Sequence, residues 1–204
     1  MNERNLRVLE FPKILEMLAS LVVTDLGREA ARALCPSGEA DIVRRWQAQT
    51  EEASTIFAYN GANPMAYFTD VRPYLKLAKV GSTLSPKALL QVADALKASR
   101  VVRSALVTDR EDTPLLTEMG SRLATNRGLE EEIFNAILSE DEISDHASPA
   151  LYDIRRQMRI LNDRVREKLN GIVRSASMQK YLMDAIITMR NGRYVVPVKA
   201  ECRQ

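Results

Sequence analysis

Arginines recur at short intervals between residues 155 and 174 of this sequence. Seven Lys or Arg residues fall in this stretch, against only two acidic residues. At about 100° per residue, Arg155, Arg159 and Arg166 lie within an arc of about 40° on a helix. Guanidinium groups match phosphate oxygens in shape and charge, so a row of them can follow a nucleic-acid backbone without reading its bases. This spacing predicts a phosphate-binding edge, and we call the three residues the arginine stripe.

Neighbouring cations extend this candidate site. The full set of candidate nucleic-acid contacts is Arg155, Arg156, Arg159, Arg166, Arg193 and Lys199. The alternative interpretation is a long exposed helix whose arginines are solvated or paired with acidic neighbours, such as those of the run 130–132. The sequence pattern alone does not separate the two interpretations.

The helix that must position the stripe is predicted to begin at Ser148–Pro149 and to end near Ser175, because serine caps helices and proline suits their first turn. Its roughly 27 residues would span about 40 Å. Seven apolar residues follow one narrow face, which we call the seam: Leu151, Ile154, Met158, Leu161, Val165, Leu169 and Ile172. We expect the seam to be buried against the preceding helices or against a partner copy.

A β-hairpin is predicted after this helix, from Ile186 to Val198. Two β-branched runs flank Asn191–Gly192, a pair that tolerates the positive φ angles of a type I′ turn. Pro197 cannot donate a ladder hydrogen bond, so its strand should lie at an edge or carry a bulge. An isolated hairpin is marginal in water, and the sequence supplies no further strand. We therefore expect these residues to be a fragment that enters a further module.

The rest of the chain is predicted to be helical, so the fold class is mainly α. Ser, Thr or Asp residues or prolines stand where most of these helices should begin. The expected helices cover residues 12–21, 25–34, 39–59, 73–81, 86–107, 114–124 and 128–138. Trp46 is most simply a core residue. We expect three parts: a helical core at 1–147, a long helix with a connector at 148–183, and the hairpin at 184–204.

No residue pattern in this chain predicts catalysis or metal binding. His146 lies near Asp145 in sequence, but its flanking residues fit a helix cap better than a catalytic triad. Glu130, Glu131 and Glu132 point to different sides of a helix and are expected to be solvated. The two cysteines are far apart, which excludes a disulfide framework and a zinc site. No GxxxxGK[ST] phosphate loop occurs.

Composition sets broader limits. The 29 basic and 27 acidic residues give a net charge of +2, so any basic surface must be local. The N-terminus lacks the apolar core of a signal peptide, and no window is long and apolar enough for a membrane helix. We therefore expect a cytoplasmic protein with no membrane partner.

Four segments resemble the N-terminal region of the type-two MutS proteins, bacterial paralogues of the mismatch-repair MutS proteins. They are LEFPKILEMLASLVVTDLGREAARAL, FTDVRPYLKLAKVGSTLSPKALLQVADALKASRVVR, EISDHASPALYDIRRQMRILNDRVREKLN and QKYLMDAIITMRNGRYVVPVKAE. The last two are the most specific. On this resemblance the helix from Ser148 to Ser175 corresponds to the lever helix, and the hairpin begins the clamp module.

The resemblance implies a homodimeric, DNA-dependent ATPase and endonuclease that binds branched or double-stranded DNA and suppresses homologous recombination. It implies ATP and Mg²⁺ in the full-length protein, and no cofactor in this chain. Two alternatives remain: the arm of an ATPase that binds rRNA and splits stalled ribosomes, or a structural spacer and dimerisation module. The family's HGxGT-like nuclease motif is absent from the chain, as is the Phe-x-Glu wedge of mismatch-repair MutS.

Overall fold

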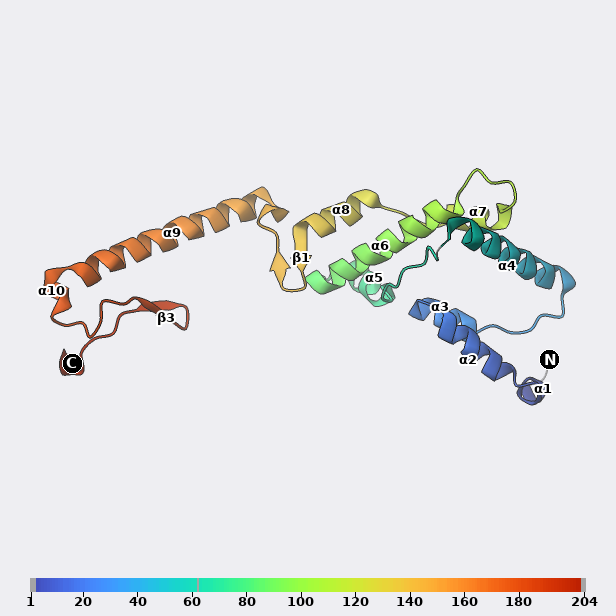
Figure 1. Cartoon of the computed structure of the whole chain (residues 1–204), viewed down its shortest axis with the longest axis horizontal. Helices are drawn as coiled ribbons and strands as arrows, with labels where there is room; N and C mark the ends of the chain where they lie inside the picture. Colours follow the sequence, from blue (N-terminus) through green and yellow to red (C-terminus); the bar gives the residue numbers. More distant parts are fainter. Residues whose placement is uncertain (1–2, 62, 203–204) are drawn as a thin grey trace. The chain divides into compact units, whose positions relative to one another are not determined.

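The computed structural model describes residues 3–61 and 63–202, and it divides the chain into two compact units at Ser144–Asp145. The fold is mainly α-helical with two small antiparallel strand pairs, which confirms the predicted class (Figure 1). Of the predicted hairpin segment 184–204, residues 203 and 204 lie outside the described residues.

Unit 1 holds eight of the described helices and the first strand pair. Its elements are α1 (Glu3–Val8), α2 (Phe11–Leu21), α3 (Asp25–Arg32), α4 (Ala40–Asn60), α5 (Arg72–Lys79), α6 (Pro86–Leu106), α7 (Pro114–Ser121), α8 (Arg127–Ala136), β1 (Ile137–Ser139) and β2 (Glu142–Ile143). Unit 2 contains η1 (Asp145–Ala147), α9 (Pro149–Arg174), α10 (Ala176–Gln179), β3 (Thr188–Arg190), β4 (Arg193–Val195) and η2 (Ala200–Cys202).

Side-chain caps explain where several helices begin. The Thr24 hydroxyl accepts a hydrogen bond from the Gly27 amide at the start of α3, and the Ser85 hydroxyl accepts one from the Ala88 amide at the start of α6. Each cap satisfies an amide that has no partner within its helix. The helices predicted from these signals are confirmed, with ends that differ by a few residues.

The apolar core of unit 1 lies where α6 packs on α8. Ala93 of α6 is fully buried beside Ile133 of α8 and Ile137 of β1. A small residue at position 93 lets the two helices approach closely, and larger side chains of both helices close the cluster around it. These partly buried neighbours are Leu89, Leu90 and Phe134. The core is small, so each of its members carries a large share of the stability of unit 1.

Two buried carboxylates hold helices of unit 1 together. Glu52 of α4 accepts hydrogen bonds from the Leu115 and Leu116 amides, at 3.2 and 2.8 Å, at the start of α7. A carboxylate at a helix N-terminus satisfies unpaired amides and opposes the helix dipole. Glu130 of α8 binds Arg100 of α6 through two hydrogen bonds, which lower the pKa of the Glu130 carboxyl against the opposing effect of burial. The prediction that Glu130 is solvated is therefore wrong.

Gly120 sets the distance between α7 and the end of α6. A methyl group at this position would lie 2.7 Å from Cβ of Leu106 and 3.1 Å from Cγ2 of Val107. We expect Gly120→Ala to push the helices apart and to lower the free energy of unfolding by about 1–2 kcal/mol. Gly171→Ala in α9 is the matched control, because its methyl group would meet no atom within 4 Å.

The control should be neutral or stabilising by up to about 1 kcal/mol, since alanine favours helices over glycine. Urea unfolding followed by circular dichroism measures both variants. Equal stability of the two would contradict the close approach of α7 and α6.

The small hairpin β1–β2 was not predicted. The sequence predicted a helix to residue 138, whereas α8 ends at Ala136 and the chain pairs Ile137 with Ile143. The Ser144 amide donates to the Ala136 carbonyl at 2.9 Å, which closes this turn. Burial of Ile137 beneath α6 explains why the helix ends early, because a tertiary contact overrides a weak helix propensity.

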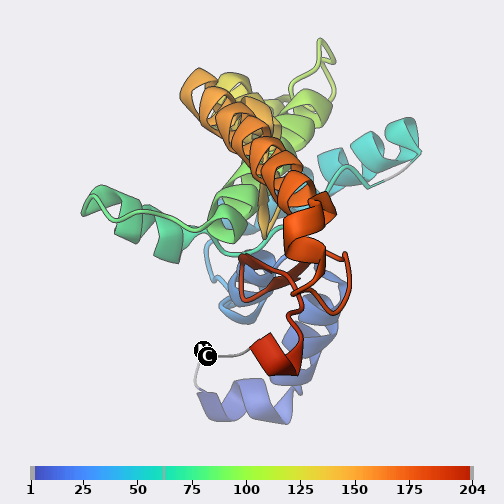
Figure 2. The same ribbon diagram turned by 90° about the vertical axis from the view of Figure 1, so that its left-hand side faces the viewer.

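The predicted hairpin of unit 2 is confirmed. β3 pairs with β4, and the two turn residues Asn191 and Gly192 have φ angles of 50° and 73°. Both angles are positive, as a type I′ turn requires. Pairing continues beyond the strands, since the Met183 amide donates to the Pro197 carbonyl at 3.0 Å. The hairpin folds back below the C-terminal half of α9 (Figures 1 and 2).

The middle of the seam of α9 is exposed within unit 2. Met158 and Leu161 each expose 57% of their surface, and Ile154 exposes 56%. Nothing within unit 2 covers the middle of the seam, and its burial against the preceding helices or against a partner copy stays a prediction. Leu151 and Leu169, towards the two ends of the seam, are only partly exposed, and Val173, one turn after Leu169, is buried, whereas Ile172 is exposed.

The chain exposes far more surface than a compact protein of its mass. Its accessible surface is 15545 Å², whereas a compact 22.9 kDa monomer would expose about 9,600 Å². Two separate globules with the sizes of the two units would together expose only about 11,000 Å². Many large apolar side chains are exposed on these helices, and such surface suits packing against further protein.

Candidate nucleic-acid interface on helix α9

The long helix α9 presents the arginine stripe on one face. Its first turn is capped by the Ser148 hydroxyl, which accepts a hydrogen bond from the Leu151 amide at 3.1 Å. Arg155, Arg159 and Arg166 follow on neighbouring positions of one side of the helix, next to the seam rather than within it. α9 therefore orders the three guanidinium groups along its length, over about 16 Å from Arg155 to Arg166.

Asp145 binds the first two arginines of the stripe. Its carboxylate accepts hydrogen bonds from Nη1 of Arg155 at 2.5 Å and from Nη1 of Arg159 at 2.8 Å. These bonds, first that from Arg159 and then that from Arg155, lower the pKa of the Asp145 carboxyl below its ordinary value, and the pKa of Arg159 is raised in turn. Internal pairing thus applies to two of the three arginines. Their common partner is Asp145 and not the acidic run 130–132.

The third arginine lies beside the hairpin. Arg166 and Asn170 of α9 line a cavity of about 450 Å³ together with hairpin residues that include Thr188 and Tyr194. The other wall is apolar, and it is formed by Met189 of β3 and by three residues that precede this strand, Ala185, Ile186 and Ile187. This cavity combines one guanidinium group, an amide and two hydroxyls. Such a set of donors suits a phosphate or another oxygen-rich group.

The remaining candidate residues are dispersed. Arg156 lies on another side of α9 from the stripe, Arg193 begins β4 at the turn, and Lys199 follows the hairpin. All three are exposed, and in the part of the chain that the structure describes none of their side chains forms an ion pair. The structure therefore brings Arg155 and Arg159 together, and it places Arg166 beside the hairpin. It does not gather the six candidates into one cluster.

Sequence reasoning missed the aromatic neighbours of the stripe. The rings of His146 and Tyr152 stack with centroids 5.3 Å apart and an angle of 20° between their planes. Tyr194 joins the cavity beside Arg166. Tyr152 could have been found from its spacing, since it precedes Arg159 by seven residues and so shares its face of the helix. The position of His146 depends on the single turn η1, for which the sequence carries no clear pattern.

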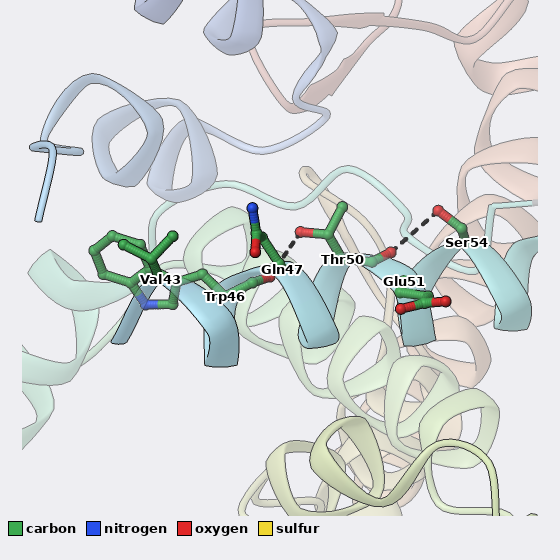
Figure 3. A pocket seen from close by; sticks show the side chains of 6 residues that line it. All are labelled: Val43, Trp46, Gln47, Thr50, Glu51 and Ser54. Atoms are coloured by element: carbon green, nitrogen blue, oxygen red, sulfur yellow. Dashed lines mark hydrogen bonds between the residues drawn. The ribbon is translucent and has the colours of Figure 1, made fainter. Parts of the chain in front are cut away.

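A shallow hollow on α4 is a weaker candidate. Figure 3 shows its lining side chains along one face of the helix, with Trp46 at one end. Trp46 exposes 44% of its surface, so the prediction that it is a core residue is wrong. The hydroxyls of Thr50 and Ser54 donate to backbone carbonyls of the same helix, at 2.9 and 3.1 Å. The hollow therefore offers an apolar surface rather than a set of reactive groups.

Two further features bear on the class of protein. Within residues 3–61 and 63–202, no group of three or more His, Cys, Asp or Glu side chains is placed to hold a metal ion. None of the helices in the same ranges combines the length and apolar composition that a membrane span requires.

The chain is similar over its whole length to curated bacterial proteins named Endonuclease MutS2. It is 44% identical to the protein of Alkaliphilus oremlandii over 205 residues, 44% identical to that of Symbiobacterium thermophilum over 203 residues, and 39% identical to that of Clostridioides difficile over 206 residues. These alignments cover 100% of this chain but only 25–26% of each relative. The chain thus spans about a quarter of the length of the curated relatives it matches. No family model matches the sequence.

Proposed function

This chain belongs to the MutS2 family, and we propose that it is a helical arm through which a MutS2 protein contacts the phosphate backbone of DNA. The observation that carries the proposal is the arginine stripe on the exposed helix α9. Phosphate contacts of this kind give affinity without sequence preference, which suits a protein that recognises the shape of branched DNA.

The pairing of Asp145 is compatible with this role. Asp145 engages one terminal nitrogen of Arg159, and a guanidinium group carries five N–H donors. The other donors of Arg159 can reach a phosphate while the ion pair holds the side chain in place. Arg166 has no acidic partner among the described residues, so it contributes a full positive charge beside the hairpin.

The catalytic activities of the whole protein belong, in this proposal, outside these 204 residues. The relatives are named endonucleases, and the resemblance implies an ATPase that uses ATP and Mg²⁺. This sequence contains no phosphate-loop motif and no HGxGT-like nuclease motif. The chain would connect the ATPase and nuclease parts of the whole protein to DNA and transmit their movements to it. In this proposal the whole protein is a cytoplasmic homodimer that suppresses recombination.

The exposed apolar surface supports the same assignment. The seam of α9 and the outer face of α4 present large apolar side chains to solvent, as an arm built to pack against other parts of a larger protein would. A phosphate contact would then come from the stripe, because it lies beside the seam and stays accessible when the seam is covered.

The triple variant Arg155→Gln, Arg159→Gln, Arg166→Gln tests the proposal. We expect it to bind branched DNA more weakly than the wild type and to flatten the dependence of log affinity on log salt by up to about 3 units, one for each arginine that no longer meets a phosphate. The fold should survive, because these side chains are exposed or half-buried. Fluorescence anisotropy of a labelled four-way junction at three salt concentrations measures both quantities.

The matched control removes three exposed positive charges from unit 1, in Arg44→Gln, Lys76→Gln, Lys79→Gln. The control variant should change the dependence of log affinity on log salt far less than the stripe variant does, although the two variants have the same net charge. Identical slopes for the wild type and the stripe variant would contradict the proposal. Binding of ribosomes without binding of DNA would support the ribosomal alternative instead.

A further inference from the structure

The start of α9 carries two stacked aromatic rings at the surface. His146 in η1 and Tyr152 in the first turn of α9 lie nearly parallel, with ring centroids 5.3 Å apart. Both residues are exposed, and Tyr152 retains 38% of its accessible surface. Stacked rings inside a core serve packing, whereas a pair at the surface leaves aromatic area in contact with water. Such a surface suits a flat, aromatic ligand.

Positive charge lies directly beside this pair. Tyr152, Arg155 and Arg159 occupy positions i, i+3 and i+7 of α9, which lie on one face of a helix. Asp145, the residue before His146, binds both guanidinium groups and so ties them to the turn that carries the histidine ring. One carboxylate therefore holds the two arginines beside the turn that carries His146, so that the rings and the guanidinium groups lie together at the start of α9.

We propose that His146, Tyr152, Arg155 and Arg159 form a binding site for unpaired nucleotides. A base stacks on the exposed aromatic surface of Tyr152 and His146, and the adjoining phosphates contact Arg159 and Arg155. This inference rests on the proposed function, that α9 contacts nucleic acid. It adds that the start of the helix binds single-stranded rather than double-stranded nucleic acid.

Unpaired nucleotides fit this surface better than a duplex does. A base within a duplex stacks on its neighbours and hides its faces, whereas an unpaired base offers a face to an aromatic side chain. Every base has such a face, so the site requires no sequence preference. A branched nucleic acid contains both kinds of strand. The rest of the stripe can then follow phosphates, since Arg166 lies about 10 Å beyond Arg159 along the helix axis.

The test compares Tyr152→Ala and Tyr152→Phe with the wild-type chain. Fluorescence anisotropy is measured with a labelled 12-nucleotide oligo-dT, an oligo-U of equal length and a 12-base-pair DNA duplex. We expect Tyr152→Ala to lose about tenfold in affinity for at least one of the single strands, as loss of one stacking partner predicts, and to change less than twofold on the duplex. Tyr152→Phe keeps the ring and should bind as the wild type does.

Tyr59→Ala is the matched control. Tyr59 is also an exposed tyrosine beside an arginine, Arg110, whose guanidinium carbon lies 4.1 Å from the ring centroid. It belongs to unit 1 and has no stacked aromatic partner among the described residues. This variant should leave the binding of single strands unchanged. The strand on which Tyr152→Ala loses more affinity, oligo-dT or oligo-U, identifies DNA or RNA as the source of the nucleotides.

The outcomes separate this inference from the proposed function. An equal loss on single strands and duplex, or no loss on any of them, overturns the stacking site. If the stripe variant weakens binding of the junction while Tyr152→Ala changes nothing, only the inference fails. If the stripe variant changes nothing while Tyr152→Ala weakens single-strand binding, the proposed function fails together with the phosphate contacts of Arg155 and Arg159, and only the stacking of bases on the two rings remains. Circular dichroism of each variant confirms that α9 is still folded.

Discussion

Ile133→Ala should destabilise unit 1 by about 3 kcal/mol. The side chain of Ile133 is 7% exposed and forms the core cluster with Ala93 and Ile137. Truncation removes three carbon atoms from a buried site and leaves a cavity that Ala93, with its single methyl group, cannot fill. Losses of about 2–5 kcal/mol are typical of such changes. Because this core is small, the loss is a large part of the total stability of a domain of this size.

Leu129→Ala is the control for this prediction. Leu129 lies one turn earlier on the same helix, and it exposes 41% of its surface, so its truncation should cost much less. Urea unfolding at 25 °C, followed by circular dichroism at 222 nm, gives both free energies. A loss of less than about 1 kcal/mol for Ile133→Ala would show that the contact between α6 and α8 is not the core of unit 1.

Glu52→Ala should lower the free energy of unfolding by about 2 kcal/mol. The variant leaves the amides of Leu115 and Leu116 at the start of α7 without their acceptor, and a buried amide without a partner costs about 1–3 kcal/mol. Glu52→Gln retains one carbonyl oxygen as an acceptor and should lie between the wild type and Glu52→Ala. The same unfolding experiment ranks the three proteins.

The neighbouring Glu51 offers a control with the same side chain. It precedes Glu52 by one position on α4 and is exposed, so Glu51→Ala should change stability by less than about 0.5 kcal/mol. Equal effects of Glu51→Ala and Glu52→Ala would mean that overall charge, and not the hydrogen bonds to α7, explains the loss.

The elements of this fold could be predicted where local chemistry specifies them. Thr24, Ser85 and Ser148 cap helices through hydrogen bonds that reach only three residues along the chain. The turn at Asn191–Gly192 likewise depends on two residues that accept positive φ angles. Such signals act within one turn and need no knowledge of the rest of the molecule.

Burial was harder to predict, because it depends on which elements meet. The seam of α9 and the face of α4 that carries Trp46 have the apolar spacing of buried helices, yet each lies exposed within its own unit. An apolar pattern shows that a face is suited to packing, and it does not identify the element that covers it. The prediction for Glu130 was wrong in the opposite direction, because a residue expected to be solvated is buried. Its burial depends on Arg100, thirty residues earlier in the chain.

The arginines of the candidate site could be predicted from the sequence, but the residues that contact them could not. The stripe follows from helical periodicity alone. Asp145 reaches Arg155 and Arg159, ten and fourteen residues away, only because η1 turns the chain back towards the first turns of α9. The same turn brings His146 over Tyr152. No periodic pattern encodes a single turn of this kind.

The bond between Glu52 and α7 has a consequence for the order in which unit 1 folds during synthesis. Glu52 accepts hydrogen bonds from amides that lie 63 and 64 residues further along the chain. A ribosome adds about 5–20 residues per second, so α4 leaves it roughly 3–13 s before its partner exists. In contrast, α2 and α3 are adjacent in the chain and pack on each other as soon as both have emerged. The nascent chain therefore carries α4 without α7 for seconds, and a residue of α4 that is buried in the finished fold, such as Ile56, stays open to solvent until the later helices emerge.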